Sequence, residues 1–180
     1  MEYLLIITGT MGAGKTTVLD EASDILTIQG IHHAAIDLDA LGLAHLPSAT
    51  SSHKAMYANL QSVCANYSSL GIKRLLLARA IEDRAELELC KSIVSATNTI
   101  VCRLTASIET MQQRIQQREL GISSRHYAAR VAELNEMLDR AQLENFTLTN
   151  QNRPLTDVAH ELLLKAGWIS DCRDSAHARG

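Results

Sequence analysis

The stretch TGTMGAGKTT, residues 8–17, directly continues the apolar run Tyr3–Thr8 and determines how the rest of the chain is interpreted. It matches every fixed position of the pattern G-x-x-x-x-G-K-[ST]. The apolar run is typical of a parallel strand that is buried on both faces, and the residues after Thr16 repeat apolar side chains at helical spacing. The sequence therefore predicts a strand, a glycine-rich loop and a helix, in the order that a phosphate-binding loop (P-loop) requires.

The residue types of this loop suit the binding of phosphate. Its glycines permit backbone conformations closed to other residues and leave main-chain N–H groups open to an anion. Those groups and the positive end of the following helix form a concave site for nucleotide phosphates. Lys15 adds positive charge, and the Thr16 hydroxyl is the expected protein ligand of Mg²⁺. The residues predicted to bind the phosphates of ATP are Gly9, Thr10, Met11, Gly12, Ala13, Gly14, Lys15, Thr16 and Thr17.

Length and composition predict a single enzyme-sized domain without a second binding function. The chain has 180 residues, a net charge of −3 and no basic tract, so neither nucleic acid nor an anionic membrane is an expected partner. Its four cysteines form no C-x-x-C pair, which excludes the common zinc and redox motifs. No apolar run reaches membrane-spanning length, and no cleavable signal precedes the loop. We therefore expect a cytoplasmic protein, either a monomer or a homodimer.

Strands and helices alternate along the chain, as expected for an α/β fold with a parallel sheet. A pattern break over 119–125 separates two helices, and the polar tail 170–180 is predicted to be disordered. The remaining residues, 1–169, contain no linker that would divide them. The predicted strands cover 3–8, 33–37, 72–78, 99–104 and 146–149.

Two carboxylates leave the carboxyl end of the second predicted strand, where ligands bind in open α/β sheets. They are Asp37 and Asp39, which would point the same way if the segment were extended. After the third strand, where a Walker B motif would place an acidic residue, the sequence has Arg79. We therefore assign the second magnesium ligand, direct or through water, to Asp37. Arg79 either reaches the site of a molecule that accepts phosphate from the nucleotide, or pairs with nearby Glu82 or Asp83.

Four segments together resemble the P-loop small-molecule kinases, a group that includes shikimate, gluconate, adenylylsulfate and adenylate kinases. They are GTMGAGKTT (9–17), IDLDALG (36–42), RLTASIETMQQRIQQREL (103–120) and TLTNQNRPLTDVAHELL (147–163). The resemblance covers about residues 1–167, but only the P-loop is specific by itself. It implies a three-layer P-loop NTPase fold whose five-stranded parallel sheet has the order 2-3-1-4-5. It also implies an acceptor-binding segment at about 38–67 and a short helical lid at about 114–126.

The resemblance also implies roles for individual residues. Lys15, Asp37, Arg114 and Arg118 would be catalytic, with the two arginines closing on the transferred phosphate. Asp39 would contact the acceptor, and Arg153 lies where the family often packs a side chain beside adenine. Each assignment has a simpler alternative: a strand-end Asp is often a cap, and arginines at i and i+4 are often a solvated helix face.

The expected activity is transfer of the γ-phosphate of Mg-ATP to a small hydroxyl- or phosphate-bearing acceptor. The alternative is an NTP hydrolase or nucleotide-controlled switch that acts on a protein partner. A degenerate, purely structural nucleotide-binding protein is less favoured, because Lys15 and Thr16 are both present. Acceptor-dependent release of ADP distinguishes the kinase from the other two.

Overall fold

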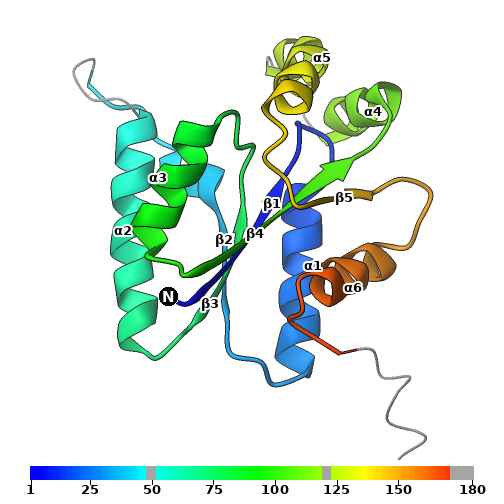
Figure 1. The fold of residues 1–180 in the computed structure, drawn as a ribbon. Coiled ribbons are helices and arrows are strands. Elements are labelled where there is room, and N and C mark those ends of the chain that lie inside the picture. Colours follow the sequence, from blue (N-terminus) through cyan, green and yellow to red (C-terminus); the bar gives the residue numbers. More distant parts are fainter. Residues whose placement is uncertain (48–51, 119–122, 171–180) are drawn as a thin grey trace, which may run out of the picture.

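A computed structural model of the chain describes residues 1–47, 52–118 and 123–170, with the backbone alone for 118 and 123–129 (Figure 1). The lid predicted at 114–126 lies partly outside these ranges, and the predicted disordered tail lies outside them from residue 171 onward. The elements in chain order are β1 (Tyr3–Thr8), α1 (Lys15–Ile28), β2 (Ala34–Asp37), the 3₁₀ helix η1 (Leu38–Gly42), α2 (Ser52–Ser69), β3 (Arg74–Ala78), α3 (Arg84–Val94), β4 (Asn98–Thr105), α4 (Ile108–Arg118), α5 (Ser123–Ala141), β5 (Phe146–Thr149) and α6 (Leu155–Lys165).

The five strands form one parallel sheet with the order β2-β3-β1-β4-β5, which confirms the predicted topology. Helices α1 and α6 cover one face of this sheet, and α2 and α3 cover the other (Figure 1). Helices α4 and α5 lie beyond the end of the sheet, beside the loop that follows β1 (Figure 1). No helix in the described ranges is both long and apolar enough to cross a membrane.

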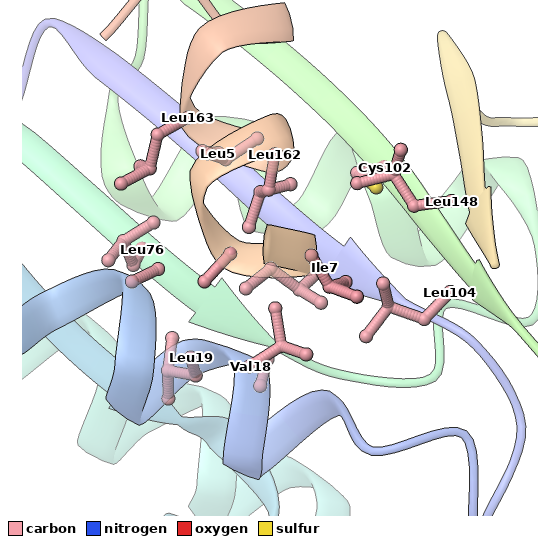
Figure 2. Packing of buried hydrophobic residues seen from close by; sticks show 14 of the residues in the cluster. Leu5, Ile7, Val18, Leu19, Leu76, Cys102, Leu104, Leu148, Leu162 and Leu163 are labelled. Carbon is pink, nitrogen blue, oxygen red and sulfur yellow. The ribbon is translucent and has the colours of Figure 1, made fainter. Parts of the chain in front are cut away.

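The central strand β1 is buried on both faces, as its unbroken apolar sequence predicts. Leu4 and Ile6 join the core under α2 and α3, whereas Leu5 and Ile7 join the core under α1 and α6. Figure 2 shows this second core, in which the β1 side chains lie among those of both covering helices. The packing fixes the end of β1, where the loop begins, at the middle of the carboxyl end of the sheet.

Two local predictions differ from the structure. The segment after β2 is not extended, because the Asp37 carboxylate accepts a hydrogen bond from the Asp39 backbone N–H and so caps η1. The two carboxylates consequently contact different partners instead of pointing the same way. Helix α5 already begins at Ser123, so the predicted break before it is shorter than 119–125.

The cysteines of the described ranges are free thiols in the core. Cys64, Cys90 and Cys102 are all buried and unpaired. Burial raises the pKa of Cys90 to about 11 and that of Cys102 to about 12, and it also raises the pKa of Cys64. Because the thiolate is the reactive form, these thiols are nearly inert at neutral pH.

We expect a Cys172→Ser variant, which retains only these three thiols, to react very slowly with a chromogenic disulfide reagent at pH 8. A pKa raised from 9.0 to about 11 lowers the thiolate fraction of Cys90 by about 100-fold, and burial restricts access further. The same variant in urea is the control, since unfolding restores ordinary pKa values and all three thiols should then react. Rapid reaction of any thiol without urea would contradict this packing.

Candidate active site

The P-loop connects the end of β1 to the start of α1 and is held from several sides. Thr8 accepts a hydrogen bond from the backbone N–H of Ile81 at 3.0 Å, which ties the end of β1 to the segment after β3. Within the loop, the N–H of Ala13 donates to the carbonyl of Thr10 at 3.2 Å. Gly14 caps α1 in a left-handed conformation with φ 92°. The loop therefore enters the helix at its positive end, as phosphate binding requires.

Two of the loop glycines are required by close packing as well as by backbone conformation. Gly12 has φ 77°, and a Cβ there would collide with the backbone of Met111 in α4. At Gly14 a Cβ would collide with the side-chain amide of Asn150 at the end of β5. Side chains at these positions would displace α4 or β5, so the loop fits only as glycine.

Asn150 is a site residue that the sequence analysis did not identify. Its side chain is 8% exposed, and its Nδ2 donates to the carbonyl of Ala13 at 2.8 Å. Its backbone N–H donates to Thr105 at 2.8 Å, which fixes Asn150 to the end of β4. Asn150 therefore joins the P-loop to the ends of β4 and β5. An isolated asparagine after a short strand carries no sequence signal for this role.

Arg114 lies against the P-loop and not on a solvated helix face. Its guanidinium donates to the carbonyl of Asn150 at 2.8 Å and to that of Gly12 at 3.3 Å. The alternative that the sequence left open for Arg114, an exposed position, is therefore wrong. The side chain of Arg118 lies outside what the structure describes, so its catalytic role stays a prediction.

Lys15 and Thr16 occupy the first turn of α1. The ammonium of Lys15 donates to the carbonyl of Thr10 at 3.2 Å, across the loop. The Thr16 hydroxyl donates to Oδ2 of Asp37 at 2.6 Å, so the P-loop and the end of β2 meet directly. This contact brings together the two residues that we predicted to be magnesium ligands.

The oxygens of Thr16 and Asp37 suit Mg²⁺, which prefers hard oxygen ligands and usually keeps several waters. Among the described residues, no group of three or more His, Cys, Asp and Glu side chains is arranged to hold a metal. A magnesium ion here would therefore be bound by one or two protein oxygens together with nucleotide phosphates and water. That is the usual arrangement where the metal arrives with a nucleotide.

Arg79 lies at the centre of a partly buried ion network at the end of β3. Its Nε donates to Glu86 at 2.9 Å, and a second guanidinium nitrogen contacts Asp39. The alternative partners that we predicted, Glu82 and Asp83, are thus incorrect. Glu86 lies one helical turn further along α3, and no spacing rule in the sequence identifies it. Glu86 also accepts a hydrogen bond from the hydroxyl of Tyr57 at 2.6 Å.

The network fixes the protonation states of Arg79 and Tyr57. Burial alone would lower the pKa of Arg79. The charges of Glu86 and Asp39 and their hydrogen bonds outweigh this effect and raise the pKa above its usual value, so the guanidinium stays charged. Burial raises the pKa of the Tyr57 phenol, and the hydrogen bond to Glu86 raises it as well. Tyr57 is therefore a neutral hydrogen-bond donor at any physiological pH.

A cavity of about 270 Å³ adjoins the P-loop on the side of α6. Arg153 lies on its wall, where the resemblance places the adenine, and also forms an ion pair with Glu161 at 2.7 Å. The residues that line the cavity are Gly14, Thr17, Arg114, Asn150, Arg153 and Leu155. The cavity is thus continuous with the predicted phosphate site.

Solved structures with a similar fold were found over nearly the whole chain. A shikimate kinase from Acinetobacter baumannii in complex with shikimate has a TM-score of 0.60 and 18% identity, and the match covers 93% of this chain and 94% of the other. The Mycobacterium tuberculosis APS kinase CysC in complex with AMPPNP and APS has a TM-score of 0.61 and 17% identity, covering 92% and 96%. A gluconokinase from Sinorhizobium meliloti has a TM-score of 0.60 and 16% identity, covering 91% and 90%.

This chain has the fold of the P-loop small-molecule kinases. No protein-family model matches the sequence, and no curated protein sequence matches it. At 16–18% identity to these three kinases, what this chain shares with them is the fold. The activity must therefore be argued from the chain's own P-loop and the residues around it.

We expect Asn150→Ala to destabilise the protein by about 1–3 kcal/mol, because the buried carbonyl of Ala13 loses its donor. The affinity for Mg-ATP should fall as well, since the P-loop loses its support. Urea denaturation and nucleotide titration measure the two effects. Asn98→Ala is the control, because the side chain of this exposed asparagine at the start of β4 donates to the side chain of Thr97, far from the P-loop. Equal stability and affinity in both variants would refute the supporting role.

Proposed function

We propose that this protein is an ATP-dependent phosphotransferase that moves the γ-phosphate of Mg-ATP to a small hydroxyl- or phosphate-bearing acceptor. The observation that carries the proposal is the hydrogen bond of 2.6 Å between Thr16 and Asp37. It joins the phosphate-binding loop to the carboxyl end of β2, where ligands of parallel sheets bind. The predicted nucleotide site and the predicted acceptor site therefore adjoin each other at the carboxyl end of the sheet.

The nucleotide half of the site supplies positive charge. The N–H groups of the loop, the start of α1 and the ammonium of Lys15 would bind the phosphates, with Arg114 beside the loop. The cavity next to Arg153 would hold the base. In phosphoryl transfer the transition state spreads negative charge over the equatorial oxygens, so such groups account for most of the catalysis. Mg²⁺, held by Thr16 and Asp37, would neutralise part of that charge.

The acceptor half supplies carboxylates. Asp37 would orient the attacking hydroxyl and accept its proton, as the oxygen–phosphorus bond forms and ADP leaves. Asp39 and Arg79, which are joined in one ion pair, would lie on the acceptor side. Arg118 and the rest of the lid would close over the transferred group and exclude water.

Lys15→Ala and Asp37→Asn should both abolish acceptor-dependent release of ADP. A positioned base typically contributes about 10²–10⁴-fold, so we expect a loss of this size for Asp37→Asn. Lys73→Ala and Asp24→Asn are matched controls, because both residues are exposed and Lys73 pairs with Glu2. Rates are measured with Mg-ATP and a panel of sugars, sugar acids, alicyclic alcohols, nucleosides, nucleotides and aminoglycosides.

The outcome separates the proposal from its alternative. Acceptor-dependent ADP release that both variants lose would support the kinase. ADP release that no acceptor changes, together with a melting temperature raised by Mg-ATP, would favour a nucleotide-controlled switch that acts on a protein partner. Unchanged turnover in Asp37→Asn would remove Asp37 from the chemistry.

A further inference from the structure

Every nitrogen of the Arg79 guanidinium already has a partner within the protein. Nε donates to Glu86 at 2.9 Å, and NH1 contacts Asp39. NH2 lies 3.3 Å from Nε2 of His53, which must accept, because a guanidinium has only donors. Arg79 is therefore not presented as an open fork, which is the form in which arginine recognises a carboxylate or phosphate.

Releasing Arg79 for an anionic ligand would be costly. Its side chain is 17% exposed and that of Glu86 is 9% exposed, so separating them would leave a buried charge without a partner. Glu86 is also fixed by the hydroxyl of Tyr57 and by the backbone N–H of Glu82, the latter at 3.0 Å. The network is accordingly a rigid wall of the acceptor site.

Asp39 keeps 59% of its side chain exposed, so its carboxylate remains open toward solvent as a hydrogen-bond acceptor. His53 is also exposed, but its Nε2 already accepts from Arg79. Two carboxylates, Asp39 and Glu86, contact the guanidinium, which leaves an excess of one negative charge among these three described residues. Glu82 does not add to this excess, because Arg130 lies 3.8 Å from it.

We propose that the acceptor is a polyhydroxylated compound that is neutral or positively charged, such as a polyol or an amino sugar, and that it carries no carboxylate or phosphate. This inference rests on the proposed function and specifies its acceptor. Hydroxyl and ammonium groups would donate to Asp37 and Asp39. A carboxylate at the same place would face like charges, because the guanidinium of Arg79 is already paired with Asp39 and Glu86.

The test uses two matched sets of compounds that differ only in charge at one carbon. The linear set is sorbitol, glucamine and gluconate, and the cyclic set is glucose, 6-amino-6-deoxyglucose and glucuronate. Binding to the protein loaded with Mg-AMPPNP is measured by calorimetry, so the result does not depend on turnover. We expect the neutral or amino member of each set to bind at least about tenfold more tightly than its carboxylate.

Asp39→Asn sharpens the test, because it removes one negative charge and weakens the contact that holds NH1 of Arg79. We expect this variant to shift the preference toward the carboxylate by about tenfold, through weaker binding of the amine and stronger binding of the acid. A purely structural role of Asp39 would weaken all members alike and leave their ratio unchanged. Asp24→Asn, the same change on the exposed side of α1, should not alter the ratio.

Tighter binding of gluconate or glucuronate would overturn the inference, and so would the absence of binding by every neutral and amino member. An unchanged ratio in Asp39→Asn would overturn the assigned cause. The proposed function fails separately: if the bound sugars do not accelerate ADP release, the transfer reaction is refuted while the charge preference stands.

Discussion

The close packing of the P-loop between α4 and β5 is the constraint on which the candidate site depends. Gly12 and Gly14 leave no room for a Cβ against Met111 and Asn150, so the loop, the start of α4 and the end of β5 hold one another in place. The Asn150 side chain then satisfies the buried carbonyl of Ala13, which would otherwise cost the loop its stability. The predicted phosphate site is therefore preorganised by these supporting contacts, and it would not have to form when an anion arrives.

The ion network around Arg79 illustrates a different balance. A buried ion pair does not by itself stabilise a fold, since desolvation opposes the Coulomb attraction. Here the ion pair fixes the orientation of its side chains. Glu86 accepts hydrogen bonds from Arg79, from Tyr57 and from a backbone N–H. This one carboxylate therefore connects α2, the end of β3 and the start of α3. The proposed acceptor side of the sheet is thereby held by charged hydrogen bonds, whereas the P-loop is held by close backbone packing.

The fold could be predicted from the sequence because its determinants are local and periodic. The P-loop and the doubly buried strand β1 define the centre of the sheet, and the observed order β2-β3-β1-β4-β5 agrees with the prediction. The contacts of Asn150, Glu86 and Tyr57 could not be predicted, because each pairs residues that only the tertiary structure brings together. The turn of η1 was missed for a local reason: Asp37 captures the N–H of Asp39 and ends the extended conformation at the strand boundary.

The replacement of a Walker B carboxylate by Arg79 gains a physical reason from this arrangement. If β3 ended in an acidic residue, it would add a charge beside Asp37, Asp39 and Glu86 with nothing to balance it. With arginine there, the cluster retains an internal cation, and the carboxylate nearest the P-loop is the one on β2, 2.6 Å from Thr16. In the proposed site, the basic groups Lys15 and Arg114 thus lie on α1 and α4, on the nucleotide side, whereas the acidic groups lie on β2, η1 and α3. The basic and acidic groups meet at the Thr16–Asp37 hydrogen bond, which is where the proposed phosphoryl transfer would take place.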